Sequence, residues 1–274
     1  MEKMVIGVIV SVGEDPAEGL NKARTLGIKT VQLGTPPPQY FSGERKEALK
    51  QAIEKTGIVV TTVFCGFIGE SYRDIPTIQR TVGLVNPAFR EERVKRTLEI
   101  ADFAKDLGVD KVAAHIGFIP EDTGSPLYKE LVEALRKVAD HCRNNGQSFC
   151  LETGQEKAEA LLRFIKAVGR DNIRVNFDPA NMVLYGTGNP IEALDILKDY
   201  VVGVHCKDGK WPTVRGQLGW EVPLGQGDVG IERFIKKLKE IGYEGPLTIE
   251  REITGEQQVK DVMEAKKLLE RLRM

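Results

Sequence analysis

The chain has 274 residues, and its 39 lysines and arginines against 40 aspartates and glutamates give a formal net charge of −1. This balance gives no electrostatic reason to expect a nucleic acid or an anionic membrane as a partner. The length fits one large α/β barrel or two small domains, and a hydrophobic fraction of 41% is enough for a substantial core.

Four cysteines, Cys65, Cys142, Cys150 and Cys206, are scattered without a CxxC pair, and neither a signal peptide nor an apolar run of membrane-spanning length is evident. We therefore expect a reduced, cytoplasmic protein with no membrane partner. Cys65 and Cys206 flank candidate site positions. We interpret both as small apolar fillers, because no thiolate-activating pattern accompanies them.

An amphipathic helix, a glycine and a short β-rich run recur along the chain, first in LGIKTVQLG and last in IGYEGPLTIE. The glycines suit helix C-caps, where the left-handed conformation costs glycine little. They are Gly27, Gly57, Gly108, Gly146, Gly169 and Gly242. Together with MVIGVIV at the start and DYVVGVHCKD before the last unit, the pattern predicts strands near residues 4–10, 29–34, 58–64, 110–115, 148–152, 173–178, 201–206 and 246–251.

Helix starts support the same division of the chain. Asp15, Ser125 and Asn189 each precede a proline and predict a side-chain N-cap with proline at the first helical position. Thr254 in TGEQ predicts a capping box for the last helix. Apolar residues also recur at helical spacing after Arg90 and in the last segment, which is typical of helices that lie on a sheet.

Strands and helices that alternate without a linker or a composition break predict that residues 1–274 form one domain, a closed (β/α)8 TIM barrel. A doubly wound open sheet is the alternative. That fold would normally place a glycine-rich nucleotide loop after the first strand, and VIVSVGEDP contains no GxGxxG.

Metal-competent residues end four consecutive predicted strands: Glu152, Asp178, His205 and Glu250. In a barrel these ends meet at one mouth, where carboxylates about 4 Å apart repel by about 4 kcal/mol per pair at an effective dielectric of about 20. A cation would remove this repulsion. Three carboxylates and one imidazole suit a divalent ion with open positions for substrate, and the oxygen-rich set favours Mn²⁺ first, with Mg²⁺, Co²⁺ or Zn²⁺ as alternatives.

The sequence here resembles the xylose isomerase-like TIM barrel family of sugar phosphate isomerases and epimerases, which includes the ketose 3-epimerases. The resemblance covers essentially the whole chain and rests on the four residues in order, on HCKD, and on PLGQGDVG before the seventh helix. It implies that the four side chains bind one divalent metal and that Glu152 and Glu250 are also the acid and base pair. It further implies a homo-oligomer, a dimer or a tetramer.

The chemistry that this set permits is proton transfer next to a carbonyl. A ketose, as a free sugar or a sugar phosphate, could chelate the metal through its carbonyl and an adjacent hydroxyl, which would stabilise an enediolate. Two glutamates acting on opposite faces would epimerise it, whereas one base carrying the proton between carbons would isomerise it. Dehydration of a keto-polyol on the same metal site is a further alternative.

Five residues are candidates for substrate contact: His115, Asn181, Lys207, Arg215 and Phe67. His115 ends the fourth predicted strand, and Lys207 lies two residues after His205, on the same side of the strand. A salt bridge to a barrel carboxylate is the alternative for Lys207. Asn181 stands where the family's epimerases commonly carry histidine, and it can hydrogen-bond a hydroxyl but cannot titrate near neutral pH.

Two long segments are expected to approach the mouth. Residues 65–89 offer Phe67, Tyr72 and Arg73, whose aromatic and guanidinium groups suit a carbohydrate. Residues 208–228 are too long for an ordinary connection and predict a lid or a partner contact that includes Arg215. Glu156 and Glu252 are interpreted as solvated surface residues.

Two other classes of function remain as alternatives. Apurinic-site endonucleases of the trinuclear-zinc type share this barrel, but they need histidines beyond the three in this chain, so no nucleic-acid partner is expected. A non-catalytic carbohydrate binder would carry the same cavity without turnover.

Overall fold

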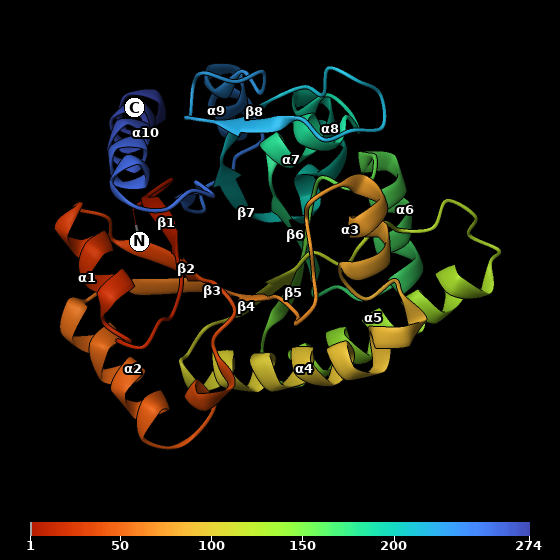
Figure 1. Cartoon of the computed structure of the whole chain (residues 1–274), viewed down its shortest axis with the longest axis horizontal. Helices are drawn as coiled ribbons and strands as arrows, with labels where there is room; N and C mark the ends of the chain where they lie inside the picture. Colours follow the sequence, from red (N-terminus) through yellow and green to blue (C-terminus); the bar gives the residue numbers. More distant parts are fainter. Residues whose placement is uncertain (1) are drawn as a thin grey trace.

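A computed structural model describes residues 2–274, and its centre is a closed barrel of parallel strands (Figure 1). In order around the barrel the strands are β1 (Ile6–Val10), β10 (Leu247–Ile249), β7 (Val201–Cys206), β6 (Ile173–Phe177), β5 (Ser148–Glu152), β4 (Lys111–Ala114), β3 (Val59–Cys65) and β2 (Thr30–Leu33). Each predicted strand overlaps one of them. The predicted (β/α)8 TIM barrel is confirmed, and the open doubly wound sheet is wrong.

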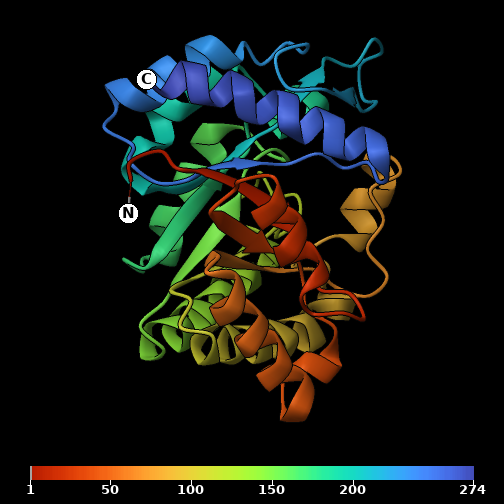
Figure 2. The ribbon, with the colours of Figure 1, turned by 90° about the vertical axis from the view of Figure 1, so that its left-hand side faces the viewer.

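Helices cover the outside of the barrel (Figures 1 and 2). They are α1 (Glu18–Thr25), α2 (Gly43–Thr56), α3 (Ile75–Thr81), α4 (Pro87–Asp106), α5 (Pro126–Asn144), α6 (Ala158–Val168), α7 (Pro179–Tyr185), α8 (Pro190–Leu197), α9 (Ile231–Glu240) and α10 (Glu256–Arg273), with 3₁₀ turns at Pro38–Tyr40 and Lys198–Tyr200. Across residues 2–274, none of the helices combines the length and apolar character that a bilayer crossing requires.

The predicted helix ends are mostly confirmed. Ser125 and Asn189 cap α5 and α8, accepting hydrogen bonds from the N–H groups of Tyr128 and Ile191. The predicted cap at Asp15 is wrong, because its carboxylate accepts from the N–H of Ala17 in a turn and α1 begins only at Glu18.

At the last helix the predicted capping box at Thr254 is also wrong. The N-cap of α10 is Gly255, with φ +81°, and no side chain caps this end. The six predicted C-cap glycines all have positive φ, from +64° at Gly169 to +74° at Gly146, so this part of the pattern is confirmed.

The strands bury side chains on both faces. Val175 and Val204 are fully buried in the apolar core on the outer face, because their strand neighbours Asn176 and His205 meet inside the barrel. Gln32 of β2 and Asn176 of β6 are also buried, and the amide nitrogen of Gln32 donates to Asn176 Oδ1 at 3.1 Å. A polar bridge therefore crosses the barrel interior below its mouth.

A small antiparallel ribbon interrupts the eight-unit repeat. It joins β8 (Asp208–Lys210) to β9 (Trp220–Val222) and lies in the segment that was expected to form a lid or a partner contact. In Figure 1 the ribbon lies above α7, and its connecting loop extends to the right at the height of α8. The other long segment, after β3, contains α3.

Candidate metal centre

The structure brings the four predicted ligands together at the carboxyl ends of neighbouring strands. Glu152 is the last residue of β5, His205 lies near the end of β7, Asp178 follows β6 and Glu250 follows β10. One ligand atom from each side chain lies within 4.8 Å of the others, and the group is largely buried. This arrangement could hold a metal ion.

The carboxylate of Asp178 has two tasks. Its Oδ1 accepts a hydrogen bond from the N–H of Asn181 at 2.9 Å and so caps α7, whose first residue is Pro179. Its Oδ2 faces Nδ1 of His205 at 3.3 Å. A charged residue therefore follows a buried strand because one oxygen starts a helix and the other belongs to the candidate centre.

The ring of His205 is oriented from the inside of the barrel. Its Nε2 lies 2.8 Å from Oε1 of Gln32 and 3.0 Å from the amide nitrogen of Asn176, and we assign the hydrogen to Nε2 because the nearer partner, Gln32 Oε1, can only accept. Its Nδ1 lies 3.0 Å from a carboxylate oxygen of Glu152 and 3.1 Å from one of Glu250. A lone pair aimed at carboxylates is unfavourable unless a proton or a metal ion lies between them.

The pKa values of these groups reflect the same crowding. Burial opposes the charged form of His205, but the carboxylates of Glu250 and Glu152 outweigh it and raise its pKa well above the ordinary value. Burial raises the pKa of Asp178. For Glu250 burial is outweighed by the charges of Lys207 and His205, which hold its pKa well below the ordinary value.

The buried groups fit a divalent metal ion. Oε2 of Glu250 is buried and lies 3.1 Å from Nδ1 of His205 and 3.2 Å from Nζ of Lys207, but within residues 2–274 neither contact has hydrogen-bond geometry. Three carboxylates and one imidazole nitrogen are hard and intermediate donors of the kind that Mn²⁺, Mg²⁺ and Zn²⁺ accept. An ion at this point would give Oε2 of Glu250 a well-directed partner and would offset the repulsion between the carboxylates.

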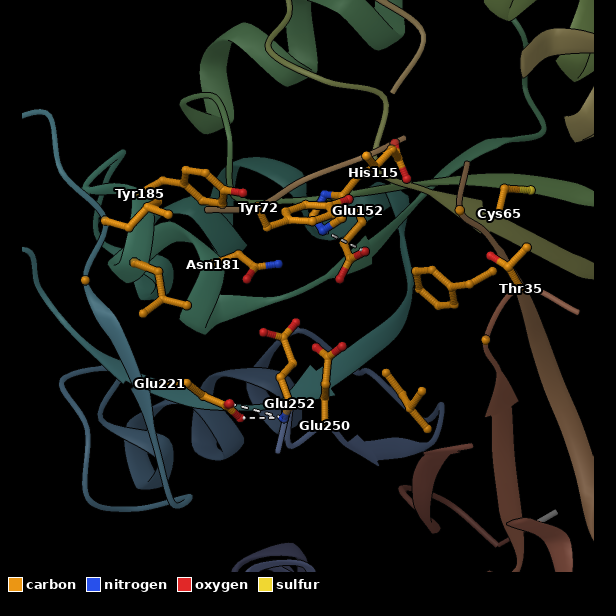
Figure 3. A pocket seen from close by; sticks show the side chains of 18 residues that line it. Thr35, Cys65, Tyr72, His115, Glu152, Asn181, Tyr185, Glu221, Glu250 and Glu252 are labelled. Carbon is orange, nitrogen blue, oxygen red and sulfur yellow. Dashed lines mark hydrogen bonds and ion pairs between the residues drawn. The ribbon is translucent and has the colours of Figure 1, made fainter. Parts of the chain in front are cut away.

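A cavity of about 560 Å³ opens above the four side chains. Glu152 and Glu250 enter it from opposite sides, and Tyr72 and Tyr185 lie on its Glu152 side (Figure 3). The ribbon contributes Glu221 to the wall. The cavity is therefore large enough for a small carbohydrate and has acid and base groups on two sides.

Two of the five predicted substrate contacts line this cavity. His115 lies 3.1 Å from Oε2 of Glu152 and packs its ring against Tyr72, with ring centroids 5.8 Å apart. Asn181 presents its amide to the same space (Figure 3). The contacts of both with a substrate stay predictions.

The other three candidates lie elsewhere. Lys207 is buried beneath the cavity, with its Nζ 2.8 Å from Glu252 and 3.2 Å from Glu250, which matches the salt-bridge alternative. Phe67 packs under the guanidinium of Arg93 outside the cavity. Arg215 is exposed in the ribbon's connecting loop and does not line the cavity.

The interpretation of Glu156 as a solvated surface residue is wrong, and that of Glu252 is incomplete, because its side chain is 59% exposed and also forms part of the cavity wall. Glu252 lines the cavity and pairs with Lys207. The signal was its place two residues after Glu250, which puts both side chains on one side of an extended segment. Glu156 is half-buried in a separate cavity, and burial raises its pKa to about 8.

The motifs HCKD and PLGQGDVG are held together by hydrogen bonds. The carboxylate of Asp208 accepts hydrogen bonds from the backbone N–H groups of Gly209, Gly225, Gly227 and Val229, at 2.9 to 3.2 Å. A Cβ atom at Gly227 would lie 1.9 Å from Asp208 Oδ1, so glycine is required there. Asp208 thus fixes the segment between the ribbon and α9.

Comparisons with known proteins agree with this geometry. Residues 20–272 match the family model described as xylose isomerase-like TIM barrel. The crystal structure of a xylose isomerase domain protein from Planctomyces limnophilus is similar over 99% of this chain and 98% of that chain, with a TM-score of 0.95 and 49% sequence identity.

Two sequence relatives are more distant. An uncharacterized protein of Methanocaldococcus jannaschii is 26% identical over 203 residues, which cover 68% of this chain and 65%, less than two thirds, of that protein. The L-ribulose-5-phosphate 3-epimerase UlaE of Escherichia coli is 24% identical over 249 residues, covering 87% of this chain and 82% of the relative.

Proposed function

Because the chain belongs to the xylose isomerase-like TIM barrel family, we propose that it is a metal-dependent carbohydrate epimerase or isomerase that transfers a proton next to a ketose carbonyl. The observation that carries the proposal is the convergence of Glu152, Asp178, His205 and Glu250 within 4.8 Å, at the base of a cavity. The name of the relative UlaE, a 3-epimerase, supports the same class of reaction.

The four side chains would hold one divalent ion, with Mn²⁺ as the first candidate because oxygen donors dominate the set. When bound, the ion would polarise the substrate carbonyl and offset the charge that develops on its oxygen. His205 would bind through Nδ1, since Nε2 is committed to Gln32.

The two glutamates are placed for acid and base work. They come from β5 and β10, three strands apart around the barrel, and face the cavity from opposite sides (Figure 3). Glu250 stays ionised beside Lys207 and suits removal of the carbon-bound proton. Glu152, whose second oxygen contacts His115, suits return of a proton to the other face. This two-sided arrangement favours epimerisation.

Asn181 would position the substrate without exchanging protons. Its Oδ1 is 3.4 Å from Nζ of Lys207, which leaves its amide N–H groups for the cavity. These can donate to a substrate oxygen, but a carboxamide does not titrate in the physiological range. The proton transfers are therefore assigned to the glutamates alone.

The test combines metal analysis with isotope exchange. The purified protein is assayed for bound metal, loaded with Mn²⁺, and incubated with free ketoses in deuterated water. We expect deuterium at one carbon next to the carbonyl, and we expect a chelator to abolish the exchange. Loss of water from the substrate would instead identify dehydration, and binding without exchange would identify a non-catalytic binder.

Variants test the two-base assignment. Glu152→Gln and Glu250→Gln should each lower kcat by at least about 1,000-fold, whereas Glu264→Gln, on the exposed face of α10, should leave it unchanged. If either cavity variant keeps wild-type turnover of an identified substrate, the assignment of that glutamate is wrong.

A further inference from the structure

The cavity above the candidate metal centre has a strongly acidic lining. Among the residues that the structure describes, its wall contains no lysine or arginine. The glutamates that line it are Glu70, Glu152, Glu221, Glu250 and Glu252. The proposed reaction uses Glu152 and Glu250. Of the other three, Glu70 is fixed by the N–H groups of Phe67 and Gly83, at 2.9 and 2.7 Å, and the proposed reaction gives none of the three a task.

The three remaining carboxylates lie toward opposite ends of the cavity. Glu221 and Glu252 are neighbours, because both carboxylate oxygens of Glu221 accept from the N–H of Glu252 at 3.1 Å. Glu70 is at the other end, beside Gly66 and Thr35. Figure 3 shows Glu221 and Thr35 at opposite sides of the view, with Glu152 and Glu250 between them. A ligand extending from the metal centre in either direction therefore meets a carboxylate.

The cations near the Glu221 end are already paired. Nζ of Lys207 is buried between Glu250 and Glu252. The guanidinium of Arg251 lies 2.8 Å from Glu221 and 2.7 Å from Asp261. Neither charge is directed into the cavity toward a ligand.

The cation near the Glu70 end, Arg93, also has partners within the protein. Arg93 is buried, donates to the carbonyl of Gly83 at 2.7 Å, and lies 4.0 Å from Glu70. Its guanidinium is covered by the rings of Phe67 and Phe89, with centroids 5.2 and 4.9 Å away. A phosphoryl group at this end would meet Glu70 without access to the positive charge behind it.

Building on the function proposed above, we infer that the substrate is an uncharged, unphosphorylated polyhydroxy carbonyl compound and that Glu252 and Glu221 determine this specificity. Ionised carboxylates only accept hydrogen bonds, so they suit the hydroxyl groups of a sugar. A phosphoryl group is an acceptor with a charge near −2 and is repelled by the same oxygens. The chain would thus differ from UlaE, whose name specifies a phosphorylated ketose.

The principal experiment uses the wild-type protein loaded with Mn²⁺. D-Fructose, L-ribulose and D-xylulose are each compared with their terminal phosphate esters, by kcat/KM for isotope exchange and by calorimetric Kd. We expect at least about a 100-fold preference for the free sugar by both measures, because juxtaposed like charges cost several kcal/mol. An ester that reacts or binds as well as its free sugar overturns the inference.

Two variants test whether Glu252 determines the preference for free sugars over phosphate esters. Glu252→Gln should narrow the ratio between free sugar and ester by about 10-fold, and Glu264→Gln should leave the ratio unchanged. Circular dichroism checks that each variant is folded. If Glu252→Gln does not fold, the comparison of free sugars with esters in the wild-type protein decides the inference. An unchanged ratio in folded Glu252→Gln removes Glu252 as a determinant.

The two proposals fail in different ways. Exchange with an ester but not with a free sugar keeps the proposed function and overturns the specificity. If no compound exchanges deuterium, the proposed function fails, and the calorimetric comparison still decides the specificity. Tighter binding of free sugars than of esters then supports the inferred specificity. Tighter binding of esters, or binding of neither class, overturns that specificity.

Discussion

The ring of His205 joins the interior of the barrel to its mouth. Nε2 donates to Gln32, whose amide nitrogen donates in turn to Asn176, while Nδ1 faces the carboxylates. Partners of this kind fix the tautomer and orientation of a metal-binding histidine. Gln32 thus acts on the candidate centre through His205, although its strand β2 lies three strands away from β7 around the closed barrel.

Replacing Gln32 tests this role. Gln32→Leu keeps the approximate size of the side chain but leaves Nε2–H of His205 unpaired, so the affinity for Mn²⁺ should fall by about 10- to 100-fold. Titration against a competing fluorescent chelator measures the change. Gln51→Leu, at an exposed position of α2, is the matched control. Equal affinity in both variants would show that Gln32 does not position the ligand.

Metal affinity should also depend on pH. The raised pKa of His205 keeps a proton on Nδ1 in the metal-free protein at neutral pH, and a metal ion must displace it. Affinity should therefore rise about tenfold per pH unit up to the pKa of His205 and level off above it. Calorimetry in buffers of different ionisation enthalpy should count about one proton released, whereas none would contradict a protonated Nδ1.

Individual site residues were predictable to different degrees. Glu152, Asp178, His205 and Glu250 could be found because a polar residue after an apolar strand is unusual and barrel topology collects such positions. Gln32 could not, since an isolated glutamine in a strand resembles an ordinary surface residue, whereas Glu252 could have been found from its place two residues after Glu250. For Lys207 the spacing identified the right region, but only the contacts to Glu250 and Glu252 show that its charge is already neutralised.

At the scale of elements, a single carboxylate organises the wall of the cavity formed by the ribbon. Asp208 begins β8 and gathers the N–H groups of Gly225, Gly227 and Val229 from beyond β9. Leu218, Gly219 and Glu221 of the same ribbon line the cavity. The ribbon is therefore anchored at Asp208, while its connecting loop projects outward.

Asp208→Asn should weaken the hydrogen bonds that anchor the ribbon. The amide offers one acceptor in place of two and brings N–H groups toward backbone donors, so the free energy of unfolding should fall by at least about 2 kcal/mol. Denaturant titration gives the change, and faster proteolysis within residues 211–219 gives its location. Asp171→Asn breaks an exposed pair with Arg143 and should cost less than about 1 kcal/mol. Equal losses would argue against a special role for Asp208.

The prediction of elements succeeded where local geometry alone decides them. Ser125 and Asn189 were correct N-caps, because each has a short acceptor followed by proline at the first helical position. Asp15 has the same local sequence, but its carboxylate closes a turn with Ala17 and the helix starts later. The ribbon could not be predicted, because the N–H groups that hold it to Asp208 are remote in sequence.

At the scale of the whole molecule, the first and last strands close the barrel. Ile6, Gly7 and Val8 of β1 pair with Leu247, Thr248 and Ile249 of β10, which leads directly to Glu250. A Cβ atom at Gly7 would lie 2.7 Å from Oγ1 of Thr30, so this close approach requires glycine. The alternation of strands and helices predicted this closure.

Metal binding should stabilise the whole barrel, since the four ligands join β5, β6, β7 and β10. An ion at about 100 times its Kd adds about 2.7 kcal/mol to the free energy of unfolding, which corresponds to a rise in Tm of about 5 °C. Differential scanning calorimetry with and without Mn²⁺ measures this, and Glu250→Gln should reduce the rise. No shift with Mn²⁺, Mg²⁺, Co²⁺ or Zn²⁺ would contradict a metal centre in the folded barrel.

The pairing of β1 with β10 also has a consequence for the order of events during translation. The amino-terminal half emerges from the ribosome first and contains β1 and Gln32, but none of the four ligands. Glu250 emerges last of the four, on a strand that finds its partner among the earliest residues made. We therefore expect the closure of the cylinder and the completion of the ligand set to coincide, because the strand that closes it ends one residue before Glu250, so a nascent chain that still lacks this strand should not retain the ion.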